Sequence, residues 1–192
     1  MRRFMPVIDA MLGAGGALRF ITLTVVDGPD LAERVRHLER SFRKLKQQKL
    51  WRRCVEGGIR VLEIKRGERS GLWHPHYHLL VTGNYIPQRE LAVAWKKATG
   101  DSGIVHVCFA GANVVKELFK YTVKDAGLTP GDLDEAARVL KGKRVVAVLG
   151  LFYNRQVPLA EAGEQPRCEV CGGQSWLPED VFMGRCVRVL RE

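Results

Sequence analysis

The chain has 192 residues, a length that favours one domain or one domain with a small appendage. Hydrophobic residues make up 46% and charged residues 27% of the sequence, as in ordinary soluble globular proteins, and no apolar run is long enough for a membrane span. The 31 Lys and Arg residues outweigh 21 Asp and Glu residues, and this net charge of +10 favours a polyanionic partner, with nucleic acid first.

The residue pattern predicts strands mixed with helices along the first 150 residues. Residues 19–26 are β-branched and apolar and predict a strand. Apolar residues then recur at helical spacing, which predicts one long amphipathic helix over residues 31–51. Further strands are expected at residues 59–65, 74–82, 104–109 and 144–149, and further helices at residues 87–98, 112–124 and 133–140.

The fold class follows from the second and third predicted strands. Residues 59–65 and 74–82 are separated only by a short polar, glycine-containing loop, so we expect them to pair as a hairpin. This pairing favours an α+β fold, with an antiparallel sheet flanked by helices, over a doubly wound parallel sheet.

The long predicted helix and the residues after it are strongly basic. A helix of this kind can lay positive charge along a phosphate backbone, and Arg43 and Lys46 are candidate DNA contacts. The alternative is a solvated helix face. The basic residues of this stretch are Arg34, Arg36, Arg40, Arg43, Lys44, Lys46, Lys49, Arg52 and Arg53.

Three histidines, His74, His76 and His78, alternate in the third predicted strand. Residues two apart in a strand project from the same face, so His76 and His78 direct two imidazoles at one point. Pairing with the second strand places Glu63 on that face. Two nitrogens and one carboxylate leave coordination positions open, which is typical of a catalytic divalent-metal site. His74 is a further candidate as an alternate ligand, a supporting group or a DNA contact.

A second group of chemical interest lies in the predicted helix 112–124. Tyr121 and Lys124 are three residues apart and share a helix face, with Lys120 adjacent. Ammonium groups near a phenol favour its ionised form, and a metal that polarises a phosphate makes that phosphate open to attack. Tyr121 and Lys124 are therefore candidate catalytic residues, and Lys120 is a candidate DNA contact. The alternative for Tyr121 is a structural residue at the edge of the core.

The chain resembles the HUH endonucleases, and among them the rolling-circle replication initiators (Rep proteins) with one catalytic tyrosine. Three blocks match in order: residues 20–24 (FITLT), the His-Tyr-His of residues 76–78 and the Tyr-x-x-Lys of residues 121–124. Relaxases place the tyrosine before the histidine motif, whereas here it follows. Position 125 is Asp125 and no second tyrosine lies nearby, so the resemblance is to the one-tyrosine members.

This resemblance implies a sheet of the RRM or ferredoxin type and an enzyme that nicks and joins single-stranded DNA at a replication origin. Tyr121 would form a 5′-phosphotyrosine bond, and Lys124 would steer the phosphate. Glu63, His76 and His78 would hold Mg²⁺ or Mn²⁺. The sequence has no Gly-x-x-x-x-Gly-Lys-Ser/Thr motif, so strand separation would come from a partner such as a host helicase or from supercoiling. The resemblance also implies that the free 3′-hydroxyl primes a host polymerase.

The composition changes near residue 158, which predicts a nuclease domain over residues 1–157 and a cysteine-containing tail over residues 158–192. Cys168 and Cys171 form half of a zinc knuckle, and Cys186 is a third candidate ligand for Zn²⁺. The alternative is a pair of free thiols in a flexible tail. The five cysteines and the absence of a recognisable signal peptide favour a reducing, cytoplasmic location.

Three other functions remain open at this point. The chain fits a single-tyrosine transposase of the same fold, or a single-stranded DNA-binding module that has lost catalysis. It also fits a metal-dependent hydrolase in which Tyr121 is structural.

Overall fold

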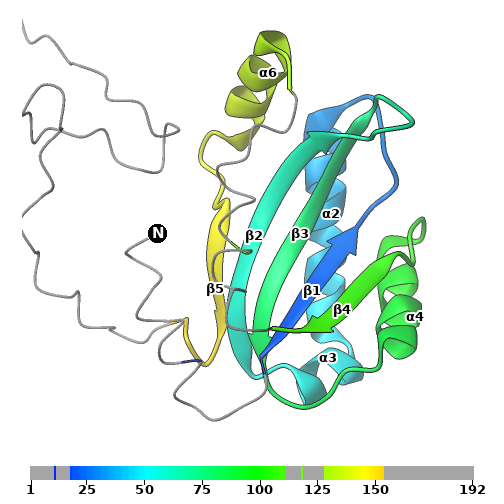
Figure 1. The fold of residues 1–192 in the computed structure, drawn as a ribbon, viewed down its shortest axis with the longest axis vertical. Helices are drawn as coiled ribbons and strands as arrows, with labels where there is room; N and C mark the ends of the chain where they lie inside the picture. Colours follow the sequence, from blue (N-terminus) through cyan, green and yellow to red (C-terminus); the bar gives the residue numbers. More distant parts are fainter. Residues whose placement is uncertain (1–10, 12–17, 111–117, 119–127, 154–192) are drawn as a thin grey trace, which may run out of the picture.

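A single five-stranded antiparallel sheet organises the computed structural model, which describes residue 11, residues 18–110, residue 118 and residues 128–153. The strand order is β4-β1-β3-β2-β5 (Figure 1). The strands are β1 (Arg19–Thr24), β2 (Gly57–Arg66), β3 (Trp73–Thr82), β4 (Val105–Phe109) and β5 (Val146–Gly150), and the helices are α2 (Leu31–Gln47), α3 (Lys49–Cys54), α4 (Gln88–Thr99) and α6 (Pro130–Leu140).

The first four strands, with α2 and α4, follow the β-α-β-β-α-β order of ferredoxin-like folds. The predicted α+β class with an antiparallel sheet and flanking helices is therefore confirmed. The strand that comes first in the sequence, β1, lies between β3 and β4, so the centre of the sheet joins segments far apart in the chain. None of the described helices combines the length and the apolar character that a membrane span requires.

The prediction of one long helix over residues 31–51 is wrong, because the chain breaks at Gln48. The backbone of Gln48 is extended, with ψ of 147°, and its side-chain amide donates to the carbonyl of Ala94, 2.9 Å away in α4. This tertiary hydrogen bond holds the break, and the separate helix α3 then turns Trp51 and Cys54 into the core. The helical spacing of the apolar residues continues across the break, so periodicity alone does not reveal it.

Both faces of the sheet are buried. On one face α2, α3 and α4 pack as a helical layer (Figure 1), and residues such as Leu23 and Tyr77 point into this core. The opposite face carries a second apolar cluster, in which Phe20 from β1 and Leu80 from β3 pack with the fully buried Leu118. The alternation of side chains in β3 thus directs Tyr77 to one core and its neighbours to the other face.

Candidate metal centre

Strands β2 and β3 bring together three of the predicted site residues. Their register pairs Glu63 with His76 and Val61 with His78. Directly opposed residues in an antiparallel pair share a face, so all three polar side chains lie on the face opposite the helical layer. They are also buried, with exposed fractions of 9% for Glu63, 3% for His76 and 5% for His78.

The three side chains meet at one point. The Glu63 Oε2 atom lies 2.7 Å from His76 Nε2 and 2.8 Å from His78 Nε2, and the two Nε2 atoms are 3.0 Å apart. In an octahedral site with metal–ligand distances of about 2.1 Å, adjacent ligand atoms lie about 3.0 Å apart. The three atoms are therefore spaced like one face of an octahedron, and Glu63, His76 and His78 fit a divalent cation with the opposite positions open to substrate or water.

The surrounding hydrogen bonds orient both imidazoles toward this point. The Nδ1 atom of His76 lies 3.2 Å from the carbonyl of His74, which can only accept, so Nδ1 donates there and Nε2 faces the shared centre. The Nδ1 atom of His78 lies 3.1 Å from the hydroxyl of Thr22 in β1. Both rings thus use one nitrogen for support and the other for the shared centre.

The carboxylate of Glu63 is held in its charged form. Burial raises its pKa, but hydrogen bonds from His76 and His78 and their positive charge outweigh burial and lower the pKa to about 2. A buried anion facing two imidazole nitrogens is the donor set that a divalent metal requires.

His74 lies beside this group, and its side chain serves a different contact. Its Nδ1 pairs with the carboxylate of Asp27, which also accepts a hydrogen bond from Ser70 in the β2–β3 loop. Burial raises the pKa of Asp27, but the bonds from Ser70 and His74 lower it below its ordinary value. Asp27 therefore joins the loop after β1 to the start of β3. The side chain of His74 is tied to Asp27, and its backbone carbonyl supports His76.

Sequence reasoning missed Thr22 and Asp27 as parts of this site. Thr22 lies within the predicted first strand, and Asp27 fits a turn between that strand and the next helix. No local pattern distinguishes either residue, because each contacts a histidine more than 40 positions away. Only the pairing of β1 with β3 brings these residues to the histidines.

Arg43 and Lys46 lie on the other side of the molecule. Both are exposed on α2, which packs against the face of the sheet opposite the three metal-binding candidates. Their predicted role as DNA contacts therefore concerns a surface separate from the candidate metal centre. The remaining predicted residues, Lys120, Tyr121, Lys124 and the three tail cysteines, lie outside the described residues, as does the proposed boundary at residue 158.

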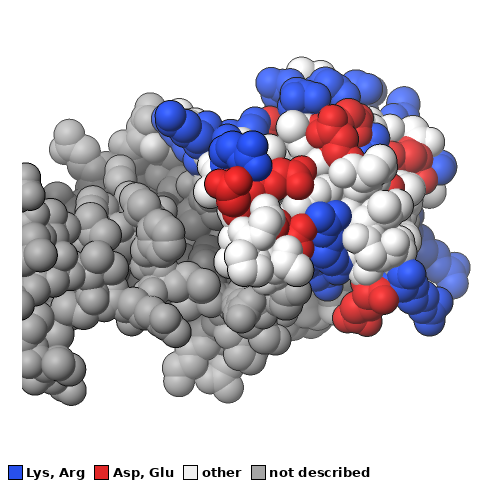
Figure 2. Space-filling view, turned by 90° about the horizontal axis from the view of Figure 1, so that it is seen from above, with Lys and Arg blue, Asp and Glu red and all other residues white. Residues whose placement is uncertain are grey.

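Charge is mixed at the end of the molecule that carries the β2–β3 loop and α6. Figure 2 looks onto this end and shows Lys and Arg side chains interspersed with Asp and Glu. At this end the guanidinium of Arg66, the last residue of β2, binds the carboxylate of Asp132 in α6. This end therefore does not present an unbroken basic surface to a polyanion.

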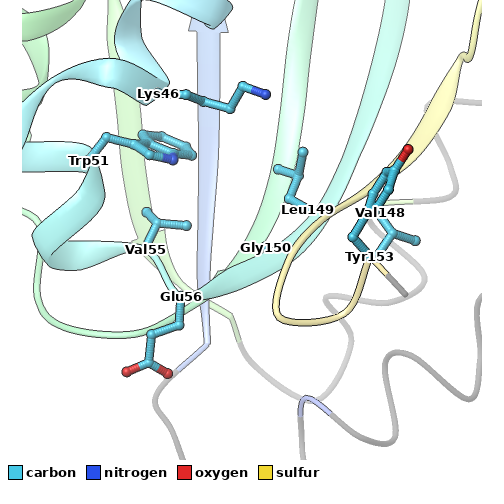
Figure 3. Close-up of a pocket in the computed structure, with 8 residues that line it drawn as sticks. All are labelled: Lys46, Trp51, Val55, Glu56, Val148, Leu149, Gly150 and Tyr153. Carbon is cyan, nitrogen blue, oxygen red and sulfur yellow. The ribbon is translucent and has the colours of Figure 1, made fainter. Parts of the chain in front are cut away.

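A hollow of about 240 Å³ lies between α2–α3 and β5 (Figure 3). The Trp51 ring and the Lys46 side chain line it on one side, and Tyr153 lines it on the other. None of its lining residues belongs to the Glu63, His76 and His78 group, so this hollow is distinct from the candidate metal centre.

Together, the fold and the site define a ferredoxin-like protein with a buried two-histidine, one-carboxylate group suited to a divalent cation. The family model described as "Replication protein" matches residues 8–174, and the chain belongs to this family. The prediction that the chain is a replication (Rep) protein is thereby confirmed.

Individual relatives support the same assignment. The chain is 39% identical over 88 residues to a protein named "Protein rep" from Bacillus sp, a match that covers 41% of this chain and 29% of the relative. It is 33% identical over 123 residues to a "Protein rep" from Staphylococcus aureus, covering 56% of this chain and 54% of the relative. A "Protein rep" from Lactiplantibacillus plantarum is 30% identical to the chain over 150 residues, a match that covers 66% of this chain and 47% of the relative.

These matches cover between 29% and 54% of the relatives' own length. The chain thus spans about half or less of these curated relatives. No solved structure matches the chain significantly.

Proposed function

We propose that the chain is a site-specific endonuclease and strand transferase that initiates rolling-circle replication by nicking single-stranded DNA. The convergence of Glu63, His76 and His78 on one point is the observation that carries this proposal. Membership in the replication protein family supports DNA as the substrate and an origin as the place of action.

A Mg²⁺ or Mn²⁺ ion held by these three residues would polarise the scissile phosphate and offset its negative charge. The residues of the chain do the rest of the positioning. His74 fixes the His76 ring through its carbonyl, and Thr22 fixes the His78 ring through its hydroxyl. Since the three ligands would occupy one face of the coordination sphere, the phosphate would approach from the opposite side of the ion.

Tyr121 is the proposed nucleophile. In this step the phenol loses its proton to solvent, its oxygen bonds to phosphorus, and the bond from phosphorus to the 3′ oxygen breaks. The leaving oxygen takes up a proton and becomes a 3′-hydroxyl, while the 5′ end stays on the tyrosine. Lys124 would stabilise the phenolate and the phosphate through its positive charge. A second transfer to the bound 5′ phosphate would rejoin the strand.

The position of Leu118 supports this assignment of Tyr121. Leu118 is helical and fully buried in the apolar cluster on the same sheet face as the histidines, beside Phe20 and Leu80. Tyr121 follows three positions later in the sequence. The chain therefore passes over the face of the sheet that carries the proposed metal ligands shortly before it reaches the proposed nucleophile.

A covalent-adduct assay tests the proposal. The protein is incubated with Mn²⁺ and a labelled library of single-stranded oligonucleotides, and adducts that survive denaturation are separated and sequenced. We expect an adduct with a consensus sequence that is lost in Tyr121→Phe and in His78→Ala. Tyr153→Phe is the matched control, because Tyr153 lines the hollow between α2–α3 and β5, away from the candidate metal centre, and we expect this variant to retain the adduct.

The same assay distinguishes the other functions. Cleavage that survives Tyr121→Phe would indicate a metal-dependent hydrolase, and binding without any cleavage would indicate a non-catalytic DNA-binding module. Either result would overturn the proposed mechanism. A recognised sequence from the ends of a mobile element, instead of a replication origin, would assign the chain to the single-tyrosine transposases.

A further inference from the structure

Two exposed aromatic rings lie against one buried arginine at the end of the sheet. Arg19 begins β1 and is 7% exposed, and its Nη1 donates to the carbonyl of Gly83 at 2.9 Å. Its guanidinium carbon lies 5.6 Å from the centre of the Tyr85 ring and 5.8 Å from the centre of the Phe109 ring. Both distances are within the range of cation–π attraction.

The two rings are far more exposed than large aromatic side chains usually are. Tyr85 is 64% exposed and Phe109 is 72% exposed, although each ring offers a large apolar surface. Exposed aromatic faces beside an arginine are the features on which proteins stack unpaired nucleobases. The arginine therefore holds two ring faces in place without covering them.

The backbone that carries the rings is also fixed. Phe109 ends strand β4 and pairs directly with Arg19. Tyr85 lies in the loop between β3 and α4, where the side-chain amide of Asn84 donates to the carbonyl of Arg53 at 3.0 Å. Because these anchors already hold the rings, little conformational entropy would be lost when a ligand binds.

We propose that Tyr85, Phe109 and Arg19 form a stacking site for unpaired nucleobases of single-stranded DNA. Base–aromatic stacking tolerates every base, because each base has a π face, and a nearby arginine adds cation–π attraction and charge complementarity to the phosphates. Bases in a duplex are already stacked and paired, so this site selects single strands. The inference rests on the proposed function for its ligand, namely the DNA strand that the candidate metal centre would cut.

The site lies near the metal centre but on the other face of the sheet. Thr22, which supports His78, lies three residues after Arg19, or about 10 Å along β1, and because side chains alternate, Arg19 and Phe109 face the side of the helices. β4 is an outer strand of the sheet, and its His106, opposite Thr22, is exposed on the same face as the histidines. A strand leaving the metal centre would cross β1 and pass around the edge strand β4 to reach the rings on the other face.

Equilibrium binding of a fluorescein-labelled oligothymidine measures the contribution of the rings. A stacked base is worth about 1–3 kcal/mol, so we expect Phe109→Ala and Tyr85→Ala each to weaken binding about 5- to 150-fold. Phe109→Trp and Tyr85→Phe retain a ring and should bind within about twofold of the unaltered protein. Tyr153→Ala, which removes another ring that is 59% exposed, should have no such effect.

Two further readouts separate stacking from a general loss of folding or charge. Binding of a duplex of equal length should change less than twofold in the alanine variants, and so should Mn²⁺ affinity, because the rings do not contact Glu63, His76 or His78. The proposal is overturned if the double alanine variant binds oligothymidine as the unaltered protein does. It is also overturned if Tyr153→Ala or duplex binding shows an equal loss.

The outcome is distinguishable from a failure of the proposed function. If the alanine variants weaken single-strand binding but no covalent adduct forms in any variant, the stacking site stands and the nuclease proposal fails. If adducts form normally and the rings make no difference to binding, the nuclease proposal stands and the stacking site fails.

Discussion

Replacing Thr22 with valine tests whether the support of His78 sets metal affinity. Valine keeps the shape and the β-branched side chain that suit a strand, but it removes the hydroxyl that lies 3.1 Å from His78 Nδ1. Loss of such a supporting partner typically weakens metal binding about 10- to 100-fold, or about 1.4 to 2.7 kcal/mol.

The structure favours the lower end of this range. The ring of His78 also packs on Phe20, with a distance of 5.3 Å between the ring centres, and this contact remains in the variant. The ring therefore keeps part of its orientation, and we expect the affinity for Mn²⁺ to fall about tenfold, or about 1.4 kcal/mol.

Titration of the protein with Mn²⁺, followed by the electron paramagnetic resonance signal of the free ion, measures this affinity without DNA. Thr24→Val is the matched control, since Thr24 lies on the same strand and face but its hydroxyl donates to the carbonyl of Ile104. An unchanged affinity in Thr22→Val, or an equal loss in Thr24→Val, would refute the argument that the Thr22 hydroxyl positions the His78 ligand.

Three other changes test the site and the fold. Glu63→Gln keeps the shape of the side chain but removes the negative charge that faces both histidines, so Mn²⁺ binding measured by calorimetry should fall at least tenfold; binding at the original affinity would exclude Glu63 as a ligand. Tyr77→Phe tests how stability depends on pH. Burial raises the pKa of Tyr77 from 10.0 to about 12, so the phenol keeps its proton to a higher pH in the folded protein than in the unfolded chain. The free energy of unfolding is therefore unaffected by this group below pH 10 and falls as the pH rises toward 12, by about 1.4 kcal/mol at pH 11. Urea unfolding at each pH should show this loss in the unaltered protein and not in the variant. The same pH dependence of unfolding free energy in both proteins would contradict the prediction. Gly58→Ala should destabilise the protein by about 1–3 kcal/mol in the same measurement, because a Cβ atom there would lie 2.2 Å from a backbone carbonyl of β3. Gly131→Ala should not destabilise it, because a Cβ atom there would meet only an ordinary contact at 3.9 Å.

The local pattern of the sequence was sufficient to predict the hairpin and its three polar residues. The alternation of His76 and His78 fixed their common face, since side chains of a strand alternate with a period of two. A short loop then required antiparallel pairing with residues 59–65, and this pairing carried Glu63 to the histidines. Both inferences use neighbours in the chain, for which local geometry is decisive.

Contacts between distant segments were beyond the reach of the same reasoning. The break at Gln48 depends on a carbonyl of α4, and the orientation of His78 depends on Thr22, 56 positions away. The placement of the basic helix α2 on the far side of the sheet from the metal ligands depends on which core its apolar stripe fills. Periodicity identifies that stripe but not the sheet face that receives it.

Apart from the helix break at Gln48, the sequence by itself therefore determined the strands and helices of the centre of the chain, the hairpin and the chemical character of its site. The tertiary structure alone decided that β1 lies between β3 and β4, and so brought Thr22 to His78 and Arg19 to Phe109. The physical reason is that strand order within a sheet is set by the burial of whole faces and by long-range pairing, which no short stretch of sequence encodes.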